Sequence, residues 1–171
     1  EAVSKRRMGL GLTSIANGIE LLCNRPNYGE VEFCKILQSV ASFLCFTAYE
    51  ASTKLAARRG AFPLFDKEKY LSGKFIRSLP SGIRNLIATH GIRNSHLISY
   101  APCGTISQTA GNVSSGVEPI FYHSVDRKVH MKDGLENVTL TDYNFREHGF
   151  KGKTLDECSI DNHMAVAQAI Q

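Results

Sequence analysis

Short hydroxyl side chains and glycines crowd one stretch of the sequence, residues 94–119, which reads NSHLISYAPCGTISQTAGNVSSGVEP. An apolar, β-branched run leads directly into this turn. A loop of this composition offers several main-chain N–H groups and short hydroxyls to a single anion. Gly104 lets the backbone approach a ligand closely, and Thr105 and Ser107 supply hydroxyl donors. The chemistry that this pattern predicts is the binding of a phosphate group.

Two elements must position this loop. Residues 98–102 are typical of the end of a buried strand, and Pro102 prevents further ladder pairing. Residues 106–110 are expected to open a helix whose positive end faces the same point as the loop. Composition alone also fits an ordinary structural turn, because glycine, serine and threonine are common turn and N-cap residues.

The context of the loop resembles the large catalytic subunit of the ribonucleotide reductases, most closely the adenosylcobalamin-dependent class. The strand, phosphate-binding loop and following helix of that subunit are similar to RNSHLISYAPCGTISQTAG followed by NVSSGVEPIF. The similarity extends upstream over RRMGLGLTSIANGIELL and YEASTKLAARRGAFPLFDKEKYLSGKFIRSLP, and downstream over FYHSVDRKVHMKDG and DNHMAVAQAIQ. It covers nearly the whole chain.

Carried over residue by residue, the resemblance implies a set of substrate-binding residues: Ser99, Pro102, Cys103, Gly104, Thr105, Ile106 and Ser107. Residues 103–107 would surround the substrate phosphates through main-chain N–H groups, and the hydroxyls of Thr105 and Ser107 would add direct bonds. Ser99 and Pro102 would flank that site. Position 103 is usually a small hydroxyl residue in the family. We therefore interpret Cys103 as a thiol that lines the loop rather than as the radical cysteine.

The fold class that the resemblance implies is α/β, as a partial segment of a ten-stranded α/β barrel. Residues 1–171 would be a single region of that barrel domain, helix-rich in the N-terminal half, with a strand–loop–helix and a β-hairpin in the C-terminal half. Reductases of this family use a thiyl radical on a finger loop, a nearby polar residue and carboxylate, and a pair of reducing cysteines. The stretches that carry those groups are not in this sequence, so no catalytic residue is expected.

The implied activity is therefore that of the complete enzyme, which converts ribonucleotides to deoxyribonucleotides. Substrate positioning would be the role of this segment, and the isolated chain is expected to be inactive. The implied partners are a ribonucleoside di- or triphosphate and the remaining reductase barrel segment or subunit. Adenosylcobalamin would serve the complete enzyme, with none bound by this segment alone. Two alternatives remain open: a non-catalytic partner half of a split reductase, and a stand-alone module that binds a phosphate ligand.

Composition favours a globular cytoplasmic protein. The chain has 171 residues, 43% of them hydrophobic and 21% charged, which is long enough for one core. No apolar run approaches the roughly 20 residues that cross a bilayer, and the N-terminus lacks an apolar signal core. A net charge of +4 and short basic clusters without interleaved aromatic residues argue against nucleic-acid binding.

Other chemistry finds little support. Five cysteines without CxxC spacing predict reduced thiols rather than disulfides or a zinc site. None of the six histidines forms an i, i+4 pair with another, so no metal site is expected. Glu118, the one carboxylate near the loop, could be taken for a catalytic base. We favour a structural role for it, because the family's catalytic carboxylate comes from an earlier segment.

Periodicity and turn residues predict the remaining elements. Helices are expected over residues 4–23, 30–59, 67–71 and 83–90, and a last helix near Asp161. Gly60 is placed to end the long helix in a left-handed cap, and Asp66 to cap the next one. Residues 121–131 and 137–143 alternate as strands do, and the break at Lys132, Asp133 and Gly134 is typical of a hairpin turn.

Overall fold

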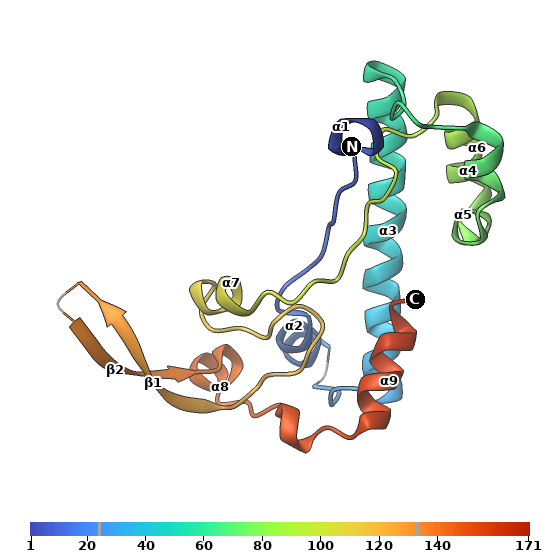
Figure 1. Ribbon diagram of the computed structural model, residues 1–171. Helices are drawn as coiled ribbons and strands as arrows, with labels where there is room; N and C mark the ends of the chain where they lie inside the picture. Colours follow the sequence, from blue (N-terminus) through green and yellow to red (C-terminus); the bar gives the residue numbers. More distant parts are fainter. Residues whose placement is uncertain (24, 133) are drawn as a thin grey trace. The chain divides into compact units, whose positions relative to one another are not determined.

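The computed structural model describes residues 1–23, 25–132 and 134–171 (Figure 1). Contacts divide the chain into two compact units. The first unit contains Glu1–Gly11 and Val40–Ser99, and the second contains Leu12–Ser39 and Tyr100–Gln171. That the whole chain is a single region of one domain stays a prediction.

Helices dominate the described residues. They are α1 (Ala2–Lys5), α2 (Ile15–Leu22), α3 (Val31–Arg59), α4 (Lys67–Ser72), α5 (Lys74–Ser78), α6 (Ser81–His90), α7 (Gly104–Thr109), α8 (Tyr143–His148) and α9 (Ile160–Ala169), with a 3-10 turn at Leu155–Glu157. Two strands, β1 (Ser124–Met131) and β2 (Gly134–Thr141), form the sheet. Helix α3 contributes residues 31–39 to the second unit and the rest to the first.

The first unit is built on the long helix α3, as its periodicity predicts. Gly60 ends this helix at φ +78°, and its N–H donates to the Ala56 carbonyl. Asp66 caps α4 by accepting a hydrogen bond from the Lys69 N–H at 3.1 Å. One apolar core joins α3 to the short helices: Ala48, Tyr49, Phe62, Ile76, Leu79, Ile83, Ile87, Ile92 and Leu97. These predicted caps and helices are confirmed.

The predicted helix over residues 4–23 is wrong in its middle. Its ends form α1 and α2, but residues 8–10 are extended and lie alongside residues 96–99. The Leu10 N–H donates to the Leu97 carbonyl at 2.7 Å, and the Leu10 carbonyl accepts from the Ser99 N–H at 2.9 Å. Gly9 and Gly11 disfavour a helix here, because glycine loses more conformational freedom than other residues. The pairing with residues 96–99 instead supplies hydrogen-bond partners to the N–H and carbonyl of Leu10.

The same pairing is all that remains of the predicted strand over residues 98–102. It consists of one parallel bridge between Leu10 and Ile98. A strand needs a ladder of paired residues along its edge, whereas this pairing is an isolated bridge in which Leu10 bonds to Leu97 and Ser99.

The second unit contains the predicted hairpin. Strands β1 and β2 pair antiparallel, from Ser124 opposite Thr141 to Met131 opposite Gly134. Strand β1 begins three residues later than predicted, and strand β2 begins three residues earlier. Of the predicted turn residues, Asp133 lies outside the described residues. Helix α8 follows β2 directly, and the sequence analysis did not predict it. Asp142 caps this helix, because its carboxylate accepts a hydrogen bond from the Phe145 N–H.

A second apolar core lies in this unit. Tyr28 is 2% exposed, and its ring centroid lies 5.1 Å from that of Phe33 on α3 and 5.6 Å from that of His163 on α9. Helix α9 begins at the predicted place, where Ser159 and Asn162 form a reciprocal capping box. Helices α3 and α9 are thereby joined around one buried tyrosine.

Helix α3 departs from one expectation. Within the described residues it is the one helix that is long and apolar enough, by length and composition, to cross a membrane. The sequence analysis saw no such run because serine, threonine and glutamine interrupt it. Core helices of globular proteins pass the same criterion, so it is weak evidence for a membrane span. Phe43, at 73% exposed, shows that α3 keeps uncovered apolar surface in this chain.

Candidate functional site

Helix α7 begins where the sequence analysis placed the phosphate loop. Cys103 is its N-cap residue, and the first helical hydrogen bond runs from the Ser107 N–H to the Cys103 carbonyl at 2.7 Å. The N–H groups of residues 104–106 precede that bond and therefore have no partner within the helix. A side chain at Gly104 would meet no atom within 4 Å, so space is open beside its backbone.

The loop after α7 folds back against its start. The Cys103 N–H donates to the Ser115 hydroxyl oxygen at 2.9 Å, and the Val113 N–H donates to the Ser107 carbonyl at 3.1 Å. The N-cap and the middle of the helix are thus bonded to residues 113–115.

A cavity of about 310 Å³ lies between this loop and the hairpin. Its lining is mostly polar and comes entirely from the second unit: Gly104, Thr105, Ser107, Gln108, Asn112, Val113, Ser114, Ser115, Ile120, Phe121, Tyr122, Arg127 and Asp142. Hydroxyl and amide groups predominate, which suits a strongly hydrated or anionic ligand.

Three of the seven predicted binding residues line this cavity, namely Gly104, Thr105 and Ser107. Their hydroxyls differ in availability. The Ser107 hydroxyl is buried and donates to the Gly104 carbonyl at 2.9 Å, so its proton is already used inside the helix. Thr105 is exposed, and its hydroxyl is the one better placed to donate to a ligand.

The other four predicted residues do not line the cavity. Cys103 is half-buried, and its thiol lies 3.4 Å from the Ala101 carbonyl. Ile106 is 65% exposed, and Pro102 is exposed. Ser99 belongs to the first unit, where its N–H pairs with Leu10. The binding roles of these four residues stay predictions.

Sequence reasoning missed the residue that holds the cavity wall together. Asn17, on α2, is 2% exposed. Its side-chain oxygen accepts from the Ser114 N–H, and its amide donates to the Asp142 carboxylate at 2.9 Å. Its backbone carbonyl accepts from the Asn144 amide at 2.9 Å. No local pattern marks Asn17, because Ser114, Asp142 and Asn144 are all distant in the sequence.

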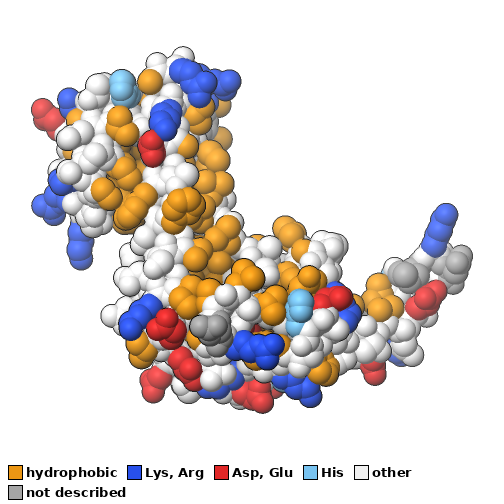
Figure 2. All heavy atoms as spheres, turned by 180° about the vertical axis from the view of Figure 1, so that it is seen from behind, with side chains coloured by type: hydrophobic (Ala, Val, Ile, Leu, Met, Phe, Trp, Pro, Cys, Tyr) orange, Lys and Arg blue, Asp and Glu red, His pale blue; other side chains and the backbone are white. Residues whose placement is uncertain are grey.

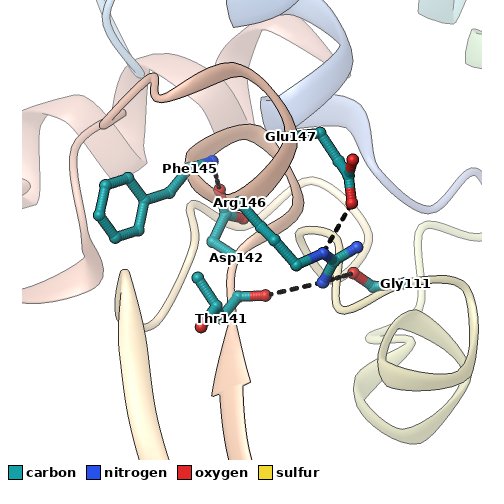
Figure 3. Close-up of polar contacts among 6 residues, drawn as sticks. All are labelled: Gly111, Thr141, Asp142, Phe145, Arg146 and Glu147. Atoms are coloured by element: carbon teal, nitrogen blue, oxygen red, sulfur yellow. Dashed lines mark hydrogen bonds and ion pairs between the residues drawn. The ribbon is translucent and has the colours of Figure 1, made fainter.

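A second clamp joins the loop to the hairpin, as Figure 3 shows. Arg146, on α8, donates from Nη1 to the Gly111 carbonyl at 3.2 Å and to the Thr141 carbonyl at 3.3 Å. Its Nε lies 2.8 Å from the Glu147 carboxylate. One guanidinium thus connects the start of the loop after α7 to the end of β2.

Glu20, on α2, is a buried carboxyl near this network. It is 1% exposed, and a side chain at Gly152 would collide with its carboxylate. Burial, and next the negative charge of Asp142, raise the pKa of Glu20 from 4.5 to about 8. The folded chain therefore holds a proton there that the unfolded chain loses at lower pH.

This difference predicts a pH-dependent stability. The folded state keeps the Glu20 proton up to about pH 8, so its contribution is full below pH 4.5 and is lost as the pH rises towards 8. Between these values we expect the unfolding free energy to fall by on the order of 5 kcal/mol. Glu20→Gln, which stays neutral, should flatten the dependence measured by urea denaturation, whereas the exposed control Glu32→Gln should not. An unchanged slope in Glu20→Gln contradicts this assignment.

The cysteines are half-buried thiols. All five are free. Burial raises the pKa of Cys34, Cys45 and Cys158, which favours the protonated thiol over the reactive thiolate. Among the described residues, no group of three or more His, Cys, Asp or Glu side chains could hold a metal ion.

Comparison with known proteins defines the class. Residues 1–169 match the family model of the ribonucleotide reductase barrel domain, so the chain belongs to that family. The mixture of helices and a sheet agrees with an α/β fold of this family. The described residues form one two-stranded sheet, so the ten-stranded barrel stays a prediction.

Individual relatives are reductase large subunits. The chain is 32% identical to a vitamin B12-dependent ribonucleoside-diphosphate reductase of Mycobacterium tuberculosis, over 87% of this chain and 19% of that protein. It is 28% identical to the ribonucleoside-diphosphate reductase large chain of Encephalitozoon cuniculi (73% and 17%) and 26% identical to ribonucleoside-diphosphate reductase 1 subunit alpha of Escherichia coli (83% and 20%). The chain spans about a fifth of the length of these relatives.

Proposed function

We propose that this chain is the phosphate-binding segment of a ribonucleotide reductase, an enzyme that reduces ribonucleotides to deoxyribonucleotides by thiyl-radical chemistry. The observation that carries the proposal is the cavity beside α7, lined by Gly104, Thr105 and Ser107. Family membership over residues 1–169 supports it. The radical and reducing cysteines would come from the rest of the enzyme, because this chain spans only about a fifth of the length of its reductase relatives.

The proposed substrate is a ribonucleoside diphosphate, because the relatives are named ribonucleoside-diphosphate reductases. Free N–H groups at residues 104–106 and the Thr105 hydroxyl would hold a phosphate and so fix the ribose for reaction elsewhere in the barrel. This positioning contributes to catalysis only when the reacting groups are present too.

Adenosylcobalamin is the proposed cofactor of the assembled enzyme. Two relatives are named vitamin B12-dependent, whereas others carry no such name. We propose that the rest of the enzyme, rather than this segment, binds the cofactor. We also propose the cytoplasm as the location.

The exposed apolar side chains support docking with the remaining barrel segment or subunit. Figure 2 shows hydrophobic side chains over much of the face drawn. Phe43 and Val31 on α3 and Ile160 and Met164 on α9 are each more than 60% exposed. Surfaces of this kind mark protein contacts. This observation also favours the alternative of a non-catalytic partner half, whereas the cavity alone would suit a stand-alone binding module.

Thr105→Ala tests the binding loop. In the assembled reductase we expect the KM for a ribonucleoside diphosphate to rise about 3- to 10-fold with little change in kcat, because one hydroxyl donor to the phosphate is lost. The control is Thr109→Ala. Thr109 lies at the other end of α7, and its hydroxyl donates to the Ile106 carbonyl. A KM equal to that of the wild type in Thr105→Ala would remove the loop from the binding site.

A further inference from the structure

The first unit contains a cavity of its own. Its volume is about 530 Å³, within the range of roughly 300–1,000 Å³ that small-molecule sites occupy. All of its described lining residues belong to Glu1–Gly11 or Val40–Ser99, and it shares none of them with the cavity beside α7. Leu64 and Phe75, which are 60% and 46% exposed, leave its mouth open to solvent. A ligand can therefore reach it.

Four aromatic rings line this cavity. They come from α3, the segment after it, α4 and α5, and are those of Tyr49, Phe62, Tyr70 and Phe75. The ring centroids of Phe62 and Tyr70 lie 5.9 Å apart, and those of Tyr49 and Phe75 lie 5.7 Å apart. A planar ligand can pack against such rings in offset or edge-on contact. The walls therefore favour an aromatic ligand.

The charged side chains of the lining are all basic when histidine is counted as neutral. They are those of Lys5, Arg7 and Lys69. Glu1 pairs with Lys5 at 2.7 Å and Asp66 pairs with Lys69 at 3.3 Å, so two of the three charges are balanced. Arg7 is exposed and has no ion-pair partner among the described residues. Its guanidinium is free to bind a carboxylate through two parallel hydrogen bonds.

Backbone hydrogen bonds fix the segment that carries Arg7 against the cavity wall. The Ser95 N–H donates to the Lys5 carbonyl at 3.2 Å, and the Met8 N–H donates to the His96 carbonyl at 3.0 Å. Arg7 lies between these two bonded positions, and Ser95 and His96 are themselves lining residues. A backbone that is ordered before binding reduces the entropy that the complex loses.

The hydroxyl groups of the wall add no negative charge. Burial raises the pKa of Tyr49 and that of Tyr70, so both phenols stay protonated at neutral pH. The Tyr70 hydroxyl donates to the Ser95 carbonyl at 3.2 Å and joins α4 to the extended segment. None of the described lining residues is an acid, so none opposes the entry of an anion.

We propose that this cavity binds a small aromatic carboxylate, whose ring packs against Tyr49, Tyr70 and Phe75 and whose carboxylate pairs with Arg7. The inference goes beyond the proposed function and does not depend on it, because the two cavities share no residue.

The test uses two probes with the same ring and opposite charge, indole-3-propionate and tryptamine. The chain contains no tryptophan, so indole fluorescence anisotropy, excited beyond the tyrosine absorption band, reports on the probe alone. When the full chain is titrated into each probe, we expect a Kd on the order of 0.1–1 mM for indole-3-propionate, as for other ligands of this size. Tryptamine should bind at least about 10-fold more weakly, because its ammonium group meets a like charge.

Arg7→Ala should weaken the binding of indole-3-propionate about 5- to 10-fold and should not weaken that of tryptamine, since a charge-assisted bond to the carboxylate is lost. Arg58→Ala is the matched control. Arg58 is an exposed arginine of the same unit that does not line the cavity, so its loss should change neither affinity.

Phe75→Ala tests the aromatic wall and should weaken both probes about 3- to 10-fold, because one ring contact is lost. Phe43→Ala is its control, since Phe43 is an exposed phenylalanine of the same unit outside the lining. Arg7 and Phe75 are both exposed, and a melting temperature equal to that of the wild type verifies that each variant is folded.

Three results would overturn the proposal. One is equal binding of the two probes, and another is unchanged affinity for indole-3-propionate in Arg7→Ala. The third concerns the complete reductase, in which saturation-transfer NMR should still detect bound indole-3-propionate. Loss of that signal would show that the rest of the enzyme covers the cavity.

Discussion

Replacing Asn17 by alanine is expected to destabilise the second unit by about 3 kcal/mol and to weaken nucleotide binding in the assembled reductase. The substitution removes the acceptor of the Ser114 N–H and a donor to Asp142, both buried. Each buried group left without a partner costs about 1–3 kcal/mol. Urea denaturation followed by circular dichroism measures the stability, and calorimetry with ADP measures the binding.

Asn27→Ala is the matched control. Asn27 is an exposed asparagine of the same unit, and its amide bonds only to the Glu30 side chain at 2.8 Å. Its loss should cost less than about 0.5 kcal/mol. If Asn17→Ala is no less stable than Asn27→Ala, the buried network does not hold the cavity wall.

Gly29→Ala is expected to cost about 2–4 kcal/mol. Gly29 has φ +75°, and an added Cβ would lie 2.5 Å from the Asn162 Cβ and 2.6 Å from its Cα. The left-handed conformation costs about 1 kcal/mol for a side chain, and crowding against the α9 backbone adds about 1–3 kcal/mol. Thermal unfolding of the chain measures the loss.

Gly60→Ala separates the two causes. Gly60 has nearly the same φ, +78°, but a side chain there would meet no atom within 4 Å. It should therefore cost only about 1 kcal/mol. Equal losses in the two variants would show that the approach of α9 to Gly29 is not close.

Local signals predicted the elements that depend on local chemistry. The apolar spacing of α3, the Gly60 cap and the Asp66 cap are all confirmed. Helix α7 begins two residues before its predicted start, because Cys103 rather than a later residue is its N-cap. Caps and periodicity act within a few residues, so one sequence contains what determines them.

Pairing between residues that are distant in the sequence could not be predicted from local signals. Residues 8–10 read as part of a helix, yet they extend because Leu10 pairs with residues almost ninety positions later. The site shows the same division. Thr105 and Ser107 follow from composition and resemblance. Only the fold brings Arg127 into the cavity lining and bonds Asn17 to the lining residues Ser114 and Asp142. Ser107 also shows that a predicted donor can be used internally, by the Gly104 carbonyl.

The most direct test is a crystal structure of the assembled reductase with a bound ribonucleoside diphosphate. We expect one phosphate within hydrogen-bonding distance of the Thr105 hydroxyl and the N–H groups of residues 104–106, in the cavity beside α7. A substrate whose phosphates bind outside this cavity, with Thr105 uncontacted, would contradict the assignment of this chain as the phosphate-binding segment.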